Sequence, residues 1–178
     1  MSTVRCGAPI LVLAMFGAVA ACHNRQEPTT AHARAADSVV LERSRCFGSC
    51  PAYRLRIGED GAVTHVSRDS GDASGTKTDS IARSQVEWLL GEAERIGFYS
   101  LPEVIADDST LCPLRATDHP TATVTIYRDD SAHTVVDYHG CYASHDLAVA
   151  PKVQQLRRFE AEIDSIAGVS RWVRPASR

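Results

Sequence analysis

The sequence predicts an α+β fold in which a mainly antiparallel sheet of about five strands, in the order βββαββα, carries two helices on one face. Three observations lead to this prediction. Short stretches alternate apolar and polar residues and are separated by turn residues. Two longer stretches place apolar residues at helical spacing. Four cysteines in the same region can staple the fold with disulfides.

Three strands are expected first. Val39, Val40 and Leu41 open the first strand, and residues 53–57 alternate apolar residues with arginines, which indicates a strand with one wet face. Asp60-Gly61 is a hairpin signal, so residues 62–68 are expected to return antiparallel to the second strand. Residues 69–78 are mostly Gly, Ser, Asp and Thr and are expected to be a loop.

Two helices and a second hairpin complete the element order. Ser80 or Ser84 is expected to cap a helix that Gly97 ends, and Pro151 is expected in the first turn of a helix that runs through Ala167 and stops at Gly168. The apolar positions of the two helices are Val86, Leu89, Leu90, Ala93 and Ile96, then Val153, Leu156, Phe159, Ile163 and Ile166. Between them, residues 122–128 and 133–138 are expected to form a hairpin around Asp129-Asp130-Ser131.

The first residues have the layout of an export signal. Arg5 precedes an uncharged apolar run of about 14 residues that ends at Ala21, whereas a membrane-spanning helix needs roughly 20. The string Val19-Ala20-Ala21-Cys22 resembles the lipobox of bacterial lipoproteins, where a fatty acid such as palmitate is attached to the cysteine and the chain is cut before it. We therefore expect lipidation at Cys22; an ordinary secretory signal, leaving Cys22 free, is the alternative.

These features divide the chain into four parts. Residues 1–21 are expected to be a lipoprotein signal peptide, and residues 22–37, which have almost no large apolar side chain, a flexible tether. Residues 38–174 are expected to form a single α+β domain of unknown function, and residues 175–178 a disordered tail.

The net charge and the expected export signal limit the classes of partner. The chain has 19 Lys and Arg against 22 Asp and Glu, and no basic tail, which argues against nucleic acid. The expected partners are the membrane, through the lipid, and an envelope protein or cell-wall component. His23 follows Cys22 where an aspartate would favour the inner membrane, so the outer membrane, facing the periplasm, is the expected location.

The four domain cysteines allow three interpretations. In an oxidising compartment Cys46 and Cys50 would close a short loop, and Cys112 and Cys141 would form a second disulfide. Alternatively, Cys46 to Pro51 resembles the copper-binding loop of Sco-type chaperones, with His139 as a distant third ligand. The third interpretation is a zinc site made by the four cysteines, or with His139 replacing one of them.

Several strings together resemble the bacterial family catalogued as domain of unknown function 6438. They are Leu41-Glu42-Arg43, Cys46-Phe47-Gly48-Ser49-Cys50-Pro51-Ala52-Tyr53, Asp60-Gly61-Ala62-Val63, residues 118–123, Asp137-Tyr138-His139-Gly140-Cys141, Ile163-Asp164 and Trp172. The resemblance covers roughly residues 39 to 173. It supports the domain and implies no activity.

Few other residues suggest chemistry. His139 and His145 lie near Asp137 and Asp146, which would suit a histidine–carboxylate acid–base pair, or equally a loop cap around a disulfide. His65 and His133 are expected at the surface or as hydrogen-bonded filler on strands. The pairs Asp107-Asp108 and Asp129-Asp130 are expected to be solvated turns, since neither has a calcium-loop pattern.

No motif of a catalytic nucleophile, phosphate loop or metalloprotease helix occurs in the sequence. We therefore expect no catalytic residue and no cofactor, and a lipid-anchored, non-catalytic binding or structural module of the cell envelope. The alternative function is envelope copper binding or thiol redox chemistry through Cys46 and Cys50.

Overall fold

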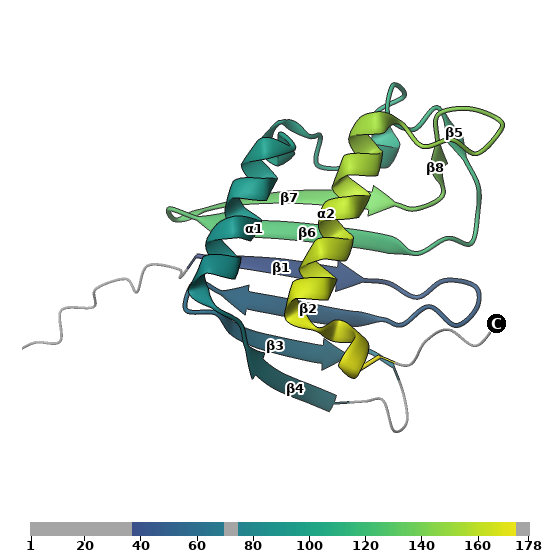
Figure 1. The fold of residues 1–178 in the computed structure, drawn as a ribbon. Coiled ribbons are helices and arrows are strands. Elements are labelled where there is room, and N and C mark those ends of the chain that lie inside the picture. Colours follow the sequence, from purple (N-terminus) through teal and green to yellow (C-terminus); the bar gives the residue numbers. More distant parts are fainter. Residues whose placement is uncertain (1–36, 70–74, 174–178) are drawn as a thin grey trace, which may run out of the picture. The chain divides into compact units, whose positions relative to one another are not determined.

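The computed structural model describes residues 37–69 and 75–173, and its main element is a six-stranded antiparallel sheet (Figure 1). Its strands, in chain order, are β1 (Ser38–Arg43), β2 (Tyr53–Gly58), β3 (Ala62–Ser67), β4 (Gly75–Ser80), β6 (Thr121–Arg128) and β7 (Ser131–Tyr138). Their spatial order is β4-β3-β2-β1-β6-β7. The predicted α+β class is confirmed. The expected signal peptide, Cys22, the tether and the tail lie outside the described residues.

Both helices cover the same face of the sheet, as predicted, with α1 (Arg83–Arg95) in teal and α2 (Pro151–Ala167) in yellow in Figure 1. Gly168 ends α2 in the left-handed conformation that glycine adopts most easily. The predicted serine caps of α1 are wrong. Ala82 is the N-cap. The backbone N–H of Ala82 donates a hydrogen bond of 2.9 Å to the side-chain oxygen of Gln85, so the first turn needs no serine.

Residues 69–78, which were expected to be a loop, contain most of β4, a strand that the sequence did not predict. β4 consists of glycine and polar residues, and its residues are exposed or half-buried. Because both of its faces meet water, it lacks the apolar–polar alternation that marks a strand in the sequence. Backbone pairing with β3, from Ala62 opposite Ser80 to Ser67 opposite Gly75, places it at the sheet edge.

The core lies between the sheet and the helices. β1 is a central strand, and its register places Val39 between Ile57 and Ile126, and Leu41 between Leu55 and Val124. The helices close this layer with Val86, Leu89 and Ala93 from α1 and Val153, Leu156, Phe159 and Ile163 from α2. These are the helix positions at which the sequence predicted an apolar stripe.

Two disulfides hold the connections at one end of the sheet. Cys46–Cys50 closes the loop between β1 and β2, and Phe47 at its tip is 90% exposed. Cys112–Cys141 is buried and ties the irregular segment after α1 to the end of the second hairpin.

Short elements accompany the second disulfide. They are η1 (Phe98–Ser100), η2 (Ile105–Asp107), and the paired strands β5 (Leu114–Arg115) and β8 (Cys141–Tyr142). Within residues 37–69 and 75–173, no helix has the length and apolar character needed to cross a membrane.

Candidate functional site, a buried charge cluster

The apolar rows of the sheet end in a cluster of charged side chains. Arg43 ends β1 and is paired in register with Tyr53 at the start of β2. Both continue the alternation of Val39 and Leu41 and therefore face the helices. Asp137, near the end of β7, faces the same layer and is fully buried. Helix α2 supplies the remaining members of the cluster.

Asp164 of α2 holds one side of the cluster. It accepts a hydrogen bond of 2.6 Å from the hydroxyl of Tyr53, and its second oxygen lies 2.8 Å from Nη2 of Arg43 and 2.9 Å from its Nε. Burial, and after it the negative charge of Asp164, raises the pKa of Tyr53. The tyrosine therefore stays a hydrogen-bond donor, and Asp164 stays paired.

Arg157 of α2 holds the other side. Its Nε donates to Oδ2 of Asp137 over 2.8 Å, and its Nη2 donates to the backbone carbonyls of Tyr138, at 3.2 Å, and Cys141, at 3.4 Å. One guanidinium thus satisfies a buried carboxylate and two carbonyls next to the buried disulfide, which fixes α2 against the end of β7.

His139 and Glu160 form the centre of the cluster. Nε2 of His139 lies 2.9 Å from Oε2 of Glu160 and 3.6 Å from Oδ2 of Asp137, and Nη1 of Arg43 lies 3.4 Å from the same Glu160 oxygen. Glu160 is 1% exposed, and its Oε1 has no hydrogen-bond partner among the described residues. The side chain of His139 is 25% exposed, so the centre is reached by water from one side.

The charges of the cluster do not cancel. When Asp137, Glu160 and Asp164 are all ionised and His139 is neutral, their three negative charges exceed the two positive charges of Arg43 and Arg157 by one. Burial raises the pKa of Glu160, an effect that His139 opposes and Asp137 reinforces. This arrangement is suited to holding one further positive charge, as a proton or as a cation.

The structure brings together only part of the predicted acid–base group. His139 and Asp137 meet as the sequence suggested, but His145 and Asp146 are exposed in the loop before α2. The principal partner of His139 is Glu160, which the sequence analysis missed. A visible signal existed, because Glu160 stands four residues after Leu156 and three before Ile163 on the apolar stripe.

The other histidines depart from expectation. His65 is buried, and neither of its ring nitrogens has a hydrogen-bond partner within residues 37–69 and 75–173, contrary to the prediction of a surface or hydrogen-bonded residue. Its ring lies 5.0 Å from that of Tyr53 and 5.2 Å from that of Trp172, and burial lowers its pKa, so it behaves as an aromatic core residue. His133 is half-buried, and its ring lies 5.3 Å from that of Phe98.

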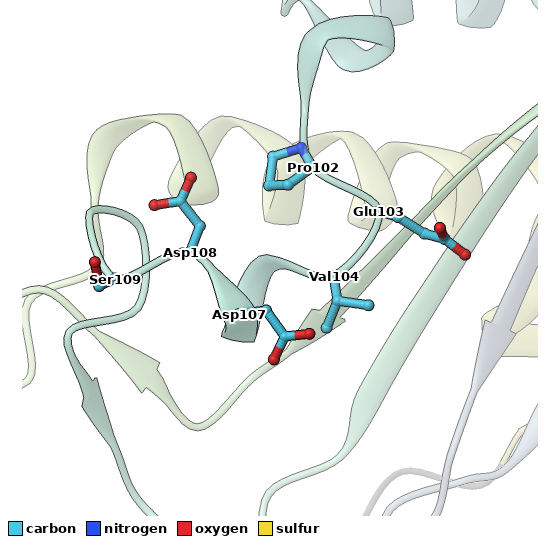
Figure 2. Close-up of a pocket in the computed structure, with 6 residues that line it drawn as sticks. All are labelled: Pro102, Glu103, Val104, Asp107, Asp108 and Ser109. Atoms are coloured by element: carbon cyan, nitrogen blue, oxygen red, sulfur yellow. The ribbon is translucent and has the colours of Figure 1, made fainter.

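An acidic depression of about 560 Å³ lies beside η2 (Figure 2). It is lined by Pro102, Glu103, Val104, Asp107, Asp108 and Ser109. Figure 2 shows the carboxylates of Glu103, Asp107 and Asp108 pointing in three different directions. Asp108 accepts a hydrogen bond of 2.8 Å from the backbone N–H of Thr110 and so stabilises a turn. These carboxylates do not converge on a point where a cation would bind.

A comparison with known families decides the relationship. The model of the family described as domain of unknown function (DUF6438) matches residues 37–167. The chain belongs to this family. A search of the curated proteins finds none that matches. The family description names no activity, so the DUF6438 domain must be interpreted from its own residues.

The fold brings together several of the strings that resemble DUF6438. Four of the strings that resemble DUF6438 each send a side chain into the charge cluster: Arg43, Tyr53, Asp137 with His139, and Asp164. The last two strings are far from the first two in the sequence, and all four meet because β1 ends, β2 begins and β7 ends at the same side of the sheet. The cluster is therefore the candidate functional site of this DUF6438 domain.

Replacing Arg157 with Gln is expected to destabilise the domain by about 3–5 kcal/mol, because it leaves the buried carboxylate of Asp137 without its ion pair. The neighbouring Arg158→Gln, on the exposed face of α2, is the matched control and is expected to change the free energy of unfolding by less than about 0.5 kcal/mol. Urea unfolding followed by circular dichroism measures both. Equal stability of the two variants would show that the pair does not hold α2.

Proposed function

We propose that this DUF6438 protein is exported, anchored by lipid on Cys22, and works in the cell envelope as a non-catalytic binding or structural module. The observation that carries the proposal is the pair of disulfides, Cys46–Cys50 and Cys112–Cys141. Disulfides of this kind persist in oxidising compartments and are rare in the cytosol. They agree with the export signal and lipobox in the sequence, and the outer membrane facing the periplasm is the proposed location.

The path of the chain supports a binding role at one end of the domain. The chain enters the sheet at Ser38, and β1 then runs about 17 Å to Arg43, after which comes the Cys46–Cys50 loop. In Figure 1 this loop and the β5–β8 pair lie at the end of the sheet where β1 finishes, which we call the distal end. A partner at the distal end, an envelope protein or a cell-wall component, would bind at the opposite end of β1 from Ser38, where the chain enters the sheet.

Phe47 is the residue at the distal end best placed to contact such a partner. It is 90% exposed, and the Cys46–Cys50 disulfide closes the loop that carries it and so limits the conformations of that loop. A preorganised aromatic side chain contributes contact area while losing little conformational entropy on binding.

Changing Cys22 to Ser is expected to abolish fatty-acid labelling and to leave the protein soluble or unprocessed, because it removes the thiol to which the fatty acid is attached. Metabolic labelling with an alkyne fatty acid, followed by membrane fractionation, measures both effects. Cys6→Ser, inside the expected signal peptide, is the control and should label normally. Labelling that survives in Cys22→Ser would contradict the anchor.

A photo-crosslinking amino acid in place of Phe47 is expected to give a discrete adduct with an envelope component in intact cells. The same amino acid at Thr78, an exposed residue of the edge strand β4, is the control and is expected to give none. Gel shift and mass spectrometry identify the adduct. The binding role of the distal end is wrong if both positions give the same pattern.

The alternative function is copper binding or thiol redox chemistry at Cys46 and Cys50. It is favoured by one observation, that this disulfide is only half-buried in an exposed loop, where reduction would leave two accessible thiols four residues apart. Against it, His139, the expected third copper ligand, is grouped with Asp137 and Glu160, and neither Cys46 nor Cys50 joins that group among the described residues.

Mass spectrometry of natively isolated protein, alkylated before and after reduction, separates the two functions. A structural disulfide predicts that Cys46 and Cys50 are alkylated only after reduction, as for the buried Cys112–Cys141 pair, which serves as the internal control. Free Cys46 and Cys50 thiols, or bound copper in the isolated protein, would favour the alternative.

A further inference from the structure

We propose that Asp137, His139 and Glu160, at the centre of the charge cluster, bind one divalent transition-metal ion of the zinc class. The site is distinct from the Cys46–Cys50 loop, and the proposal does not depend on the lipid anchor or on the role of the distal end.

The positions of the three side chains support this site. Nε2 of His139 lies 2.9 Å from Oε2 of Glu160 and 3.6 Å from Oδ2 of Asp137, and one ligand atom from each residue lies within 4.8 Å of the others. Ligand atoms bonded to zinc at about 2.1 Å are separated by roughly 3 to 3.5 Å. The two distances from Nε2 of His139 fit this spacing closely, whereas the ligand oxygens of Asp137 and Glu160, which lie within 4.8 Å of each other, would have to approach by up to about 1.3 Å.

The second observation is the unpartnered oxygen of Glu160. Its carboxylate is buried and directed at His139 through Oε2, while Oε1 has no hydrogen-bond partner in the part of the chain that the structure describes. A buried acceptor without a partner is unfavourable and uncommon in folded proteins. A metal ion beside this carboxylate would interact with both of its oxygens.

The surroundings resemble those of an open metal site. Nε and Nη2 of Arg157 hydrogen bond the carboxylate of Asp137, which is the role that outer groups play in orienting a ligand. The partial exposure of His139 leaves a side from which an ion can enter and water can complete the coordination. One imidazole with two carboxylates favours zinc, iron or manganese over calcium, which takes oxygen ligands alone.

The charge of the cluster is compatible with a dication. Three carboxylates and two guanidiniums leave one excess negative charge when His139 is neutral, and a bound dication changes this to one excess positive charge. The competitor is a proton on His139 or Glu160, which the metal must displace. Arg43, with Nη1 at 3.4 Å from Glu160, opposes the metal, so we expect weaker binding than in a four-ligand structural zinc site.

The test is calorimetric titration of zinc chloride into the full chain, extracted in mild detergent, freed of metal with a chelator and kept without reductant so that both disulfides stay closed. We expect one zinc ion per chain and no binding of calcium. His139→Gln and Glu160→Gln are each expected to weaken zinc binding at least tenfold. His145→Gln is the matched control, because His145 lies in the same segment but is exposed, and it should bind zinc like the unmodified protein.

Several results would overturn the proposal. They are absence of stoichiometric zinc binding to the unmodified protein, tenfold weaker binding in His145→Gln, and unchanged binding in both site variants. If the site variants do not fold, NMR of the histidine imidazoles in the unmodified protein decides the matter. A zinc-dependent shift of the His139 signal supports the site, whereas a shift confined to other histidines excludes it.

Discussion

The contact on which the described fold depends most is that between Arg157 and the end of the sheet. Its guanidinium pairs with the fully buried Asp137 and also donates to the carbonyls of Tyr138 and Cys141. A buried carboxylate without its partner is strongly destabilising, so this contact fixes where α2 crosses the sheet. The position of α2 in turn brings Glu160 beside His139 and Arg43.

The charge cluster has one part in which every polar group has a partner and one part in which a buried polar group has none among the described residues. Asp164, Tyr53 and Arg43 form a satisfied network, in which each carboxylate oxygen and the hydroxyl has a partner. Glu160 and His139, a few ångströms away, form an incomplete one, with a buried oxygen left over. Functional sites are one of the places where proteins retain such unsatisfied polar groups, because a ligand can supply the missing partner.

Much of the fold was predictable from local pattern, and most of the cluster was not. The alternation of apolar and polar residues in β2 and the stripe of apolar residues along α2 indicate which side chains are buried. Pro151 and Gly168 mark the ends of α2 through their backbone preferences. β4 could not be predicted, because an edge strand wet on both faces leaves no apolar pattern. Glu160 was missed because its role depends on His139, 21 residues earlier and just after β7, and periodicity alone does not relate two elements across a fold.

The central position of β1 has a mechanical consequence. Each of its residues from Ser38 to Arg43 is paired in register with β2 on one side and β6 on the other. A pull on the amino-terminal side of β1, opposed at the Cys46–Cys50 loop that directly follows it, would be carried by the extended backbone of β1 itself, so neither hydrogen-bond ladder would have to open. A force applied between these two points would therefore leave the sheet and the core beneath it intact.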